Sequence, residues 1–334
     1  MRLSIIGTGK IVREALPVIA ATDQLFIRSI LARPHSLDLA AMMAETYGIP
    51  RVCSDYAEVL SDEQVDAVYI ALINSVHFDY ALRALRAGKH VILEKPACLC
   101  ASEFRQLTYE ARARRLMLFE AVTLLHLPAF RLLCDELLPQ LGTIRHVECN
   151  YSQRSSRYDA YQRGEVLPAF DSVAGGGALM DLNIYNLHFA IALLGRPQHA
   201  TYFCTRGFNA VDLSGTAVLG WCGRDQEFES SEESEVWGNF FASKSTDAPS
   251  FGLLQGDEGW LRIDGSVSTL AAITLCLRGQ HPRPISLPPV SHRLAPEFAA
   301  FSHLFHSQDY ATMNRLLDHS LIVMQTVDQL RSGK

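Results

Sequence analysis

Short apolar runs alternate with amphipathic stretches over the first 120 residues. This alternation is typical of βαβ units, in which right-handed crossover helices join parallel strands. The candidate strands are Arg2–Ile6, Leu25–Leu31, Val65–Leu72, His90–Leu93 and Met117–Phe119, and the helical stretches include Leu37–Tyr47, His77–Ala87 and Ser102–Arg114. Pro17 lies inside the first helical stretch and predicts that this helix kinks or ends near Leu16.

The pattern changes near residue 121, where strands and turns follow one another without crossover helices. This arrangement favours an antiparallel sheet. The candidate strands are Ile144–Gln153, Ala200–Gly207, Gly215–Cys222, Glu235–Ala242, Gly259–Ile263 and Ala271–Leu277. Helical patterns cover Leu132–Leu138, Gly177–Leu194, Pro296–Phe305 and Tyr310–Leu330, and the acidic stretch Gln226–Glu235 predicts a solvated hairpin loop. We therefore expect an α/β protein with two domains, residues 1–120 and 121–334, whose last helix can pack back on the first domain.

The composition agrees with a folded protein of this size. The chain has 334 residues, of which 48% are apolar and 20% are charged, and this balance excludes wholesale disorder. Thirty basic and 36 acidic side chains give a net charge of −6, so nucleic acid is not an expected partner. No apolar run approaches the ~18 residues of a membrane span, so no membrane partner is expected either.

The N-terminus and the cysteines predict a cytoplasmic location. Residues Met1–Gly7 lack the longer apolar stretch and the cleavage site of a signal peptide. The chain has eight cysteines without a Cys-x-x-Cys pair, which does not suggest a disulfide framework. Cys98 and Cys100 form the only close pair, and no second pair at zinc-ligand spacing accompanies them, so no metal site is predicted.

A glycine-containing segment, Gly7-Thr8-Gly9-Lys10-Ile11, joins the first candidate strand to the first helix. Gly7 permits a tight turn, and Gly9 lets the backbone approach a pyrophosphate at the helix N-terminus. Val12 stands at the third glycine position of the full fingerprint, so a purely structural turn is the competing interpretation. The position after the first strand of a βαβ unit favours dinucleotide binding.

The end of the second candidate strand distinguishes the two nicotinamide dinucleotides. NAD-binding domains usually place Asp or Glu there, where the carboxylate binds the ribose 2′-hydroxyl. Arg33 follows the strand in this chain, and its guanidinium can pair with a 2′-phosphate. An ordinary surface arginine or a dual-cofactor site would also carry such a residue. The charge favours NADP over NAD.

A second motif, Glu94-Lys95-Pro96, ends an apolar candidate strand. The carboxyl ends of parallel strands are where open α/β sheets bind ligands. The Lys95 ammonium can there hydrogen-bond a substrate oxygen and stabilise developing alkoxide charge. The alternative is an ordinary surface charge at a strand end.

A third set of polar residues lies on the helix predicted after Gly175–Gly177. Asp181, Tyr185 and His188 share one face of that helix, and polar groups are costly to bury without partners. One interpretation is a network of core hydrogen bonds. The other is a proton-transfer group, Tyr185, oriented or polarised by Asp181 and Lys95.

Together these segments resemble the Gfo/Idh/MocA family (glucose–fructose oxidoreductase, inositol dehydrogenase and rhizopine catabolism) over nearly the whole chain. Further matching pieces are Asn74–His77, Gly88–His90, Glu120-Ala121 and Ser320–Met324. The resemblance implies an N-terminal Rossmann domain and a C-terminal α+β domain with an open, mainly antiparallel sheet. It also implies NAD(P)-dependent hydride transfer on a sugar-like or cyclic alcohol or carbonyl.

The resemblance also implies roles for individual residues. Lys95 matches the active-site lysine of the family, and Asp181 matches its helix aspartate. Tyr185 stands where inositol-dehydrogenase-like members have a catalytic histidine, as in the glucose–fructose oxidoreductase and dihydrodiol dehydrogenase branches. Asn183 replaces the usual glycine, and His188 stands where aspartate is common. The implied cofactor-binding residues are Gly7, Thr8, Gly9, Lys10, Ile11, Arg33, Asn74, His77, Glu94 and Lys95.

The stretch Tyr151–Asp159 offers candidate substrate contacts in Arg157 and Tyr158, to which His188 is added, although a surface loop would have the same composition. The apolar run Ala271–Leu277 predicts that the second sheet is covered in a homodimer or homotetramer. Two other functions stay open: a catalytically silent dinucleotide-binding sensor, and NAD-assisted elimination or glycoside hydrolysis.

Overall fold

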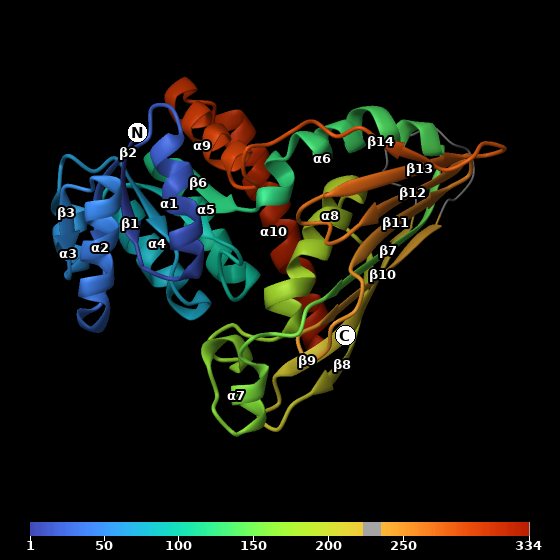
Figure 1. Cartoon of the computed structure of the whole chain (residues 1–334), viewed down its shortest axis with the longest axis horizontal. Coiled ribbons are helices and arrows are strands. Elements are labelled where there is room, and N and C mark those ends of the chain that lie inside the picture. Colours follow the sequence, from blue (N-terminus) through green and yellow to red (C-terminus); the bar gives the residue numbers. More distant parts are fainter. Residues whose placement is uncertain (223–234, 334) are drawn as a thin grey trace. The chain divides into compact units, whose positions relative to one another are not determined.

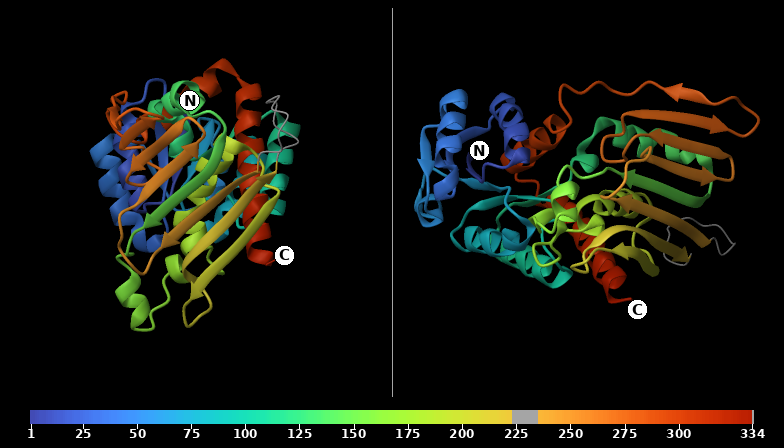
Figure 2. Two further views of the ribbon diagram at one scale, coloured as in Figure 1. Left: turned by 90° about the vertical axis from the view of Figure 1, so that its right-hand side faces the viewer. Right: turned by 60° about the horizontal axis from the view of Figure 1, so that its bottom comes forward.

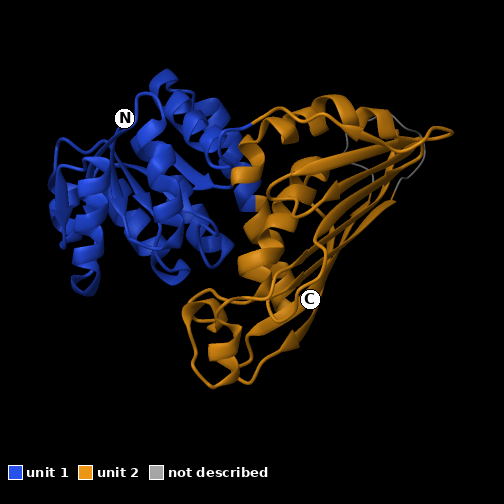
Figure 3. Cartoon of the chain, in the orientation of Figure 1, with its two compact units in different colours: residues 1–122, 290–321 blue, residues 123–289, 322–334 orange. Residues whose placement is uncertain are grey.

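A computed structural model describes residues 1–222 and 235–333, which fall into two compact units (Figure 3). Unit 1 comprises Met1–Val122 and Val290–Leu321, and unit 2 comprises Thr123–Pro289 and Ile322–Lys334. The predicted loop Gln226–Glu235 lies outside the described residues except for Glu235. Within the described ranges, no helix combines the length and the apolar character needed to cross a membrane.

A six-stranded parallel sheet forms the centre of unit 1 (Figure 1). Its strands are β1 (Arg2–Ile6), β2 (Phe26–Leu31), β3 (Arg51–Cys53), β4 (Ala67–Ile70), β5 (His90–Glu94) and β6 (Leu118–Ala121), in the order β3-β2-β1-β4-β5-β6. Its helices are α1 (Lys10–Ala21), α2 (Leu37–Tyr47), α3 (Tyr56–Ser61), α4 (His77–Arg86), α5 (Ala101–Arg114) and α9 (Ala295–Ser307). The strand order reverses between β1 and β4, which is the switch point where such sheets bind dinucleotides.

The central strands of unit 1 are apolar because helices cover both faces of a parallel sheet. Residues 3–6 of β1 and all four residues of β4 are buried. Helix α9 follows residue 289 and completes this core: the Phe301 ring stacks on Phe119 at 4.8 Å, and the Phe298 ring meets Tyr69 edge-on at 5.5 Å. Residues Val290–Leu321 thereby belong to unit 1 although they are distant from it in sequence.

An eight-stranded sheet forms unit 2, in the order β14-β13-β12-β11-β7-β10-β9-β8. Its strands are β7 (Ile144–Ser152), β8 (His199–Arg206), β9 (Asp212–Cys222), β10 (Glu235–Ser243), β11 (Phe251–Gly256), β12 (Gly259–Asp264), β13 (Ala272–Leu277) and β14 (Arg283–Ile285). Among neighbouring pairs β7 and β10 are parallel and the others are antiparallel. The helices are α6 (Pro128–Leu132), α7 (Tyr158–Gln162), α8 (Ile184–Leu194) and α10 (Tyr310–Ser332), which continues from unit 1. The predicted α/β class with a mainly antiparallel second sheet is confirmed.

The two faces of the unit 2 sheet differ. Helix α8 lies against one face (Figure 1), and its apolar side chains are buried there. Figure 2 (left) looks onto the other face, on which no helix of the described residues lies. Phe203, Trp237 and Phe241 are 65%, 41% and 36% exposed on β8 and β10.

Several elements differ from the sequence-based expectations. Helix α1 does not end at Leu16 but runs through Pro17 to Ala21. Pro17 lies on the exposed side of the helix, where water can bond the carbonyl group that its missing N–H leaves without a partner. Strands β3, β11 and β14 and helices α3 and α7 were not predicted: most are very short, and β11 contains two glycines that dilute its strand signal.

Candidate active site

The turn between β1 and α1 has the geometry of a phosphate cradle. Gly7 has φ of +121°, and a Cβ there would lie 2.6 Å from the Ala71 carbonyl oxygen, so only glycine fits. Gly9 is the N-cap of α1, has no side-chain cap, and would carry a Cβ that meets nothing within 4 Å. The first turn of α1 has no acidic side chain. Open backbone N–H groups and an approachable N-terminus fit a pyrophosphate, which Gly7-Thr8-Gly9-Lys10-Ile11 would hold.

Arg33 lies at the carboxyl end of the neighbouring strand. Strand β2 ends at Leu31, and the exposed Arg33 precedes a tight turn over Pro34–Ser36. The guanidinium is therefore accessible at the sheet edge that also carries the Gly7–Gly9 turn. This location suits contact with the 2′ position of a bound dinucleotide.

His77 has a supporting position rather than an accessible one. It is buried at the start of α4, with Nδ1 2.9 Å from the Pro96 carbonyl oxygen and Nε2 3.2 Å from that of Leu72. Burial lowers the pKa of His77, which favours the neutral ring. The imidazole thus ties the loop after β4, where Asn74 begins a helical turn, to the loop after β5. Its effect on a cofactor is through the position of these loops.

Two carboxyl groups, a partly buried one on Glu94 and a buried one on Glu120, fix the backbone around Lys95. The Tyr69 hydroxyl donates to Glu94 Oε1 at 2.6 Å, and Glu120 Oε1 accepts from the Ala97 N–H at 2.8 Å. Burial raises the pKa of both Glu94 and Glu120. The Lys95–Pro96 peptide is cis. The hydrogen bonds of Glu94 and Glu120 hold Lys95 at the carboxyl end of β5, directly after Glu94.

In unit 2, the segment 175–191 exposes two side chains. Every residue in it is buried except Asp181 and Tyr185, which are partly exposed. Asp181 lies in a π-helical turn over Leu179–Asn183, and Tyr185 lies in the first turn of α8. The Tyr185 ring is 5.9 Å from that of Tyr151. An apolar helix that leaves only a carboxylate and a phenol accessible is arranged to present those two groups.

The three glycines before this helix allow close packing. A Cβ on Gly176 would collide with the Pro168 and Ala169 backbone, and one on Gly177, where φ is +109°, would collide with the Asp212 carboxylate. Asp212 Oδ2 accepts hydrogen bonds from the Leu179 N–H at 2.7 Å and the Tyr202 hydroxyl at 2.8 Å. Burial raises the pKa of Asp212. This aspartate anchors the start of the helix that carries Asp181.

Sequence reasoning missed Asp212 and Lys244. The Lys244 ammonium donates to Asp181 Oδ2 at 2.7 Å and is 1% exposed. Both residues are distant in sequence from the helix they contact, and neither lies in a motif. The pairing of strand β10 with β9 brings the backbones of Lys244 and Asp212 together. The Lys244 N–H donates at 2.8 Å to the carbonyl of Leu213, which directly follows Asp212.

The remaining predicted residues lie elsewhere. His188 is 1% exposed, so direct contact between its ring and a substrate does not agree with this structure. Asn183 is also buried and donates to the Phe240 carbonyl at 2.8 Å, which makes it a link between helix and sheet. Tyr158 is half-buried beneath the Arg154 guanidinium, while Arg157 is exposed. Of these, Arg157 keeps the accessibility that substrate contact requires.

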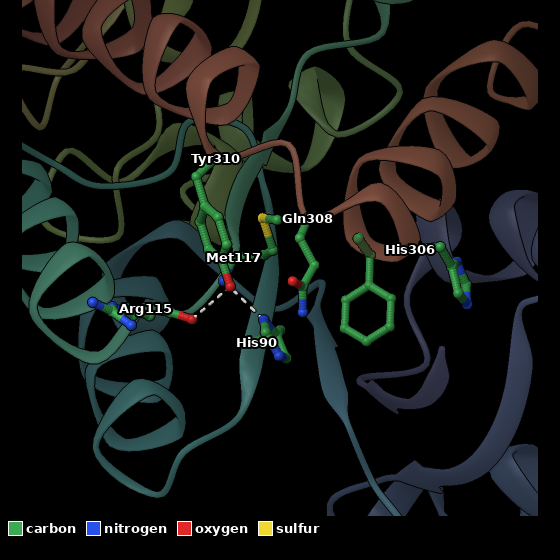
Figure 4. Close-up of a pocket in the computed structure, with 7 residues that line it drawn as sticks. His90, Arg115, Met117, His306, Gln308 and Tyr310 are labelled. Atoms are coloured by element: carbon green, nitrogen blue, oxygen red, sulfur yellow. Dashed lines mark hydrogen bonds between the residues drawn. The ribbon is translucent and has the colours of Figure 1, made fainter.

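A pocket of about 410 Å³ lies at the opposite edge of the unit 1 sheet (Figure 4). His90 begins β5 and Met117 precedes β6, so the pocket is at the amino ends of these strands. Two of its polar side chains bond to its own backbone: Tyr310 donates to the Arg115 carbonyl at 2.9 Å, and His90 Nδ1 accepts from the Met117 N–H at 2.8 Å. It is separate from the phosphate cradle.

Two family models match the chain. The model for the oxidoreductase family with an NAD-binding Rossmann fold matches residues 1–122, and the model for the GFO/IDH/MocA C-terminal domain matches residues 139–244. The chain belongs to the Gfo/Idh/MocA oxidoreductase family. The predicted family is therefore confirmed, and so is the prediction that the chain is an enzyme with an NAD(P)-binding Rossmann domain.

Individual relatives agree with this assignment. The scyllo-inositol 2-dehydrogenase (NADP(+)) IolU of Bacillus subtilis is 28% identical over 331 residues, which are 99% of this chain and 96% of the relative. The human trans-1,2-dihydrobenzene-1,2-diol dehydrogenase is 26% identical over 293 residues, 87% of this chain and 81% of the relative. KijD10, a 3-ketoreductase from Actinomadura kijaniata solved with NADP and TDP-benzene, superposes with a TM-score of 0.86 at 25% identity, covering 100% and 97% of the two chains. These relatives are consistent with hydride transfer to or from a sugar-like or cyclic substrate.

Proposed function

We propose that this Gfo/Idh/MocA oxidoreductase prefers NADP and interconverts a sugar-like or cyclic alcohol and its carbonyl, with Tyr185, Asp181 and Lys95 as the reacting set. The observation that carries the proposal is the segment 175–191, which leaves only Asp181 and Tyr185 accessible. A core network would bury both groups.

When bound, the nicotinamide supplies the hydride acceptor or donor. In the oxidation direction, Tyr185 accepts the substrate hydroxyl proton as general base. Lys95 holds the same oxygen and stabilises its developing negative charge. Asp181 orients Tyr185. In the reduction direction, Tyr185 instead donates the proton to the substrate oxygen. Arg157 is a candidate for contacts to the rest of the substrate.

The preference for NADP is supported by Arg33. The relatives named above include a scyllo-inositol 2-dehydrogenase (NADP(+)) and a ketoreductase solved with NADP. An exposed guanidinium after β2 favours a 2′-phosphate, and no carboxylate takes its place at that strand end. The cofactor-binding set comprises Gly7, Thr8, Gly9, Lys10, Ile11, Arg33, Asn74, Glu94 and Lys95, with His77 supporting the loops.

The proposal is tested in two steps. Fluorescence titration with NADPH and NADH first identifies the preferred cofactor, and that cofactor is then assayed with a panel that includes scyllo-inositol and trans-1,2-dihydrobenzene-1,2-diol. Turnover of a polyol or its ketone supports the proposal. Binding without any hydride exchange across the panel would instead indicate a sensor. Cofactor retained through purification and not consumed would indicate redox-assisted elimination.

We further propose that unit 2, which makes up most of the predicted domain 121–334, is the substrate-binding and oligomerisation domain, and that a second copy covers its open sheet face. Phe203 and Phe241 both pair with Thr216 of β9, and the Trp237 ring lies over Gly220 on the same face. Such a stripe of exposed aromatic groups is typical of interfaces. The run Ala271–Leu277 contributes less than expected, because Ile273 and Leu275 are buried.

Light scattering tests the interface. A homodimer or homotetramer at micromolar concentration is expected, and Phe203→Glu together with Trp237→Glu should shift it toward monomer. A monomeric unmutated chain would contradict the proposal. We also propose a cytoplasmic location, which is supported by the eight cysteines, all free in the structure.

A further inference from the structure

Lys244 is a buried lysine whose main chain is fixed on both sides. Its N–H donates to the Leu213 carbonyl at 2.8 Å, and its own carbonyl accepts from the Ser155 N–H at 2.9 Å. The side chain is 1% exposed. Burying an ammonium is costly unless charged and polar groups replace its hydration water. The groups that the Lys244 ammonium contacts therefore indicate the role of this residue.

Within the described parts of the chain, the ammonium contacts three groups. It donates to Asp181 Oδ2 at 2.7 Å and to the Ala169 carbonyl at 2.5 Å, and it lies 4.8 Å from the centre of the Phe170 ring. Phe170 belongs to an aromatic cluster with Tyr161, in the segment that surrounds α7. Lys244 therefore connects Asp181 to that segment.

The pair Lys244–Asp181 is asymmetric. The lysine is 1% exposed, whereas the Asp181 side chain is 41% exposed. An ion pair that only stabilised the core would bury both partners. Here one side of the carboxylate faces a fixed ammonium, and the remainder stays accessible next to Tyr185, one helical turn away. This arrangement restricts the rotation of the carboxylate.

We propose that Lys244 is a positioning residue for the reaction: it fixes the orientation of the Asp181 carboxylate, and it makes that orientation depend on the docking of the Ala169–Phe170 segment. The inference rests on the proposed function, in which Asp181 orients Tyr185. Lys244 itself touches neither the reacting atoms nor the cofactor in this scheme. Its effect on turnover must therefore pass through Asp181.

The test is a double-mutant cycle in the full-length enzyme with NADP⁺ and the panel compound it turns over fastest. Lys244→Met should lower kcat about 10- to 100-fold and leave the NADPH dissociation constant within about threefold. Asp181→Asn should lower kcat at least as much. The double variant should be no slower than Asp181→Asn alone. Lys244→Arg, which keeps the charge, should recover part of the loss.

Lys89 supplies a matched control. It is also buried, but its ammonium donates to backbone carbonyls, those of Asp62 at 2.7 Å and Val65 at 2.8 Å. Lys89→Met should lower the melting temperature and leave kcat of the folded enzyme unchanged. If Lys244→Met behaves like this control, or if its loss of kcat multiplies with that of Asp181→Asn, the inference is wrong.

Two further outcomes keep the test decisive. Should Lys244→Met not fold, Phe170→Leu removes the aromatic face beneath the ammonium and should lower kcat a few-fold only while Asp181 is present. A loss that is independent of Asp181, or no loss, overturns the inference. Unchanged kcat in Asp181→Asn would instead overturn the proposed function, which separates the two failures.

Discussion

Unit 1 carries its candidate residues directly after strands, whereas unit 2 carries them on a helix that distant strands hold in place. Gly7, Arg33 and Lys95 follow β1, β2 and β5, so the parallel sheet alone brings them to one edge. Asp181 depends on other parts of the chain, since Lys244 pairs with its side chain and Asp212 anchors the start of its helix. The difference is between positions set by local sequence and positions set by long-range packing.

This difference has a consequence for chemistry. Strand-end residues in unit 1 keep their backbone positions through the sheet, and the carboxyl groups of Glu94 and Glu120 only refine them. In unit 2, the orientation of Asp181 depends on the Lys244 side chain and on the anchoring of its helix by Asp212, and a single substitution can remove either one. Variants of unit 2 should therefore show mixed effects on stability and turnover, and variants of unit 1 should separate the two.

The largest expected effect is the loss of turnover when the reacting group of either unit is removed. Tyr185→Phe should lower turnover by about 10²–10⁴-fold, the range typical of general acid–base groups, and leave NADPH affinity within a few-fold. Lys95→Ala should be at least as severe, because it also removes stabilisation of the oxyanion. Steady-state kinetics and melting temperatures on the same preparations provide the measurement. Lower melting temperature with nearly unchanged turnover in Tyr185→Phe would mean that the tyrosine is structural.

A second, smaller effect contrasts two glycines. Gly177→Ala places a Cβ against the Asp212 carboxylate at a φ of +109°, which should cost at least about 2 kcal/mol of unfolding free energy. Gly9→Ala places a Cβ in open space and should cost no more than about 1 kcal/mol. The same Cβ in Gly9→Ala should weaken NADPH binding about tenfold or more, because the backbone can no longer approach the pyrophosphate.

Urea unfolding and fluorescence titration measure these two quantities independently. If Gly9→Ala binds NADPH as tightly as the unmutated chain, the cradle assignment fails. If Gly177→Ala is as stable as the unmutated chain, the helix start in unit 2 is not as tightly packed as the contacts indicate.

The contrast between positions set by local sequence and positions set by long-range packing explains which residues could be predicted from the sequence. The Gly7–Gly9 turn, Arg33 and the Glu94-Lys95-Pro96 motif combine strand periodicity with residue type, so their place at one sheet edge could be deduced. Asp181 and Tyr185 could be placed on a helix by their spacing of four. Lys244 gave no signal, because its role depends on β10 pairing with β9 and β7, and pairing register between strands is not encoded in local spacing.

His188 shows where helical spacing stops being informative. Its spacing from Asp181 and Tyr185 placed it on their face, but the helix begins with a π-helical turn and packs against the sheet, and the ring is buried. A helical face that reads as polar in sequence can therefore divide into an accessible part and a buried part. Only tertiary packing decides which residues fall on each side.

A third prediction concerns cofactor choice in unit 1. The exposed Arg33 guanidinium favours the 2′-phosphate, so the unmutated enzyme should bind NADPH more tightly than NADH, by about tenfold if one charge-assisted pair is responsible. Arg33→Ala should abolish this preference by weakening NADPH and leave NADH affinity unchanged. Fluorescence titration of both cofactors provides the comparison, with Arg13→Ala, an exposed arginine of α1, as the control. Equal affinities in the unmutated enzyme would refute the assignment.

The smallest expected effect is a pH dependence from the anchor of unit 2. Burial raises the pKa of Asp212, so the folded protein binds this proton more tightly than the unfolded chain. Its contribution to stability is full below about pH 4, the ordinary value for aspartate, and is lost as the pH rises through the raised pKa. Asp212→Asn cannot titrate, and its amide oxygen can still accept from the Leu179 N–H. The stability of the unmutated chain relative to this variant should therefore decrease between pH 4 and pH 7, as measured by urea unfolding at several pH values. A difference that stays constant over this range would mean that Asp212 holds its proton no more tightly in the folded protein, and that the hydrogen bonds from Leu179 and Tyr202 offset the cost of burying its charge.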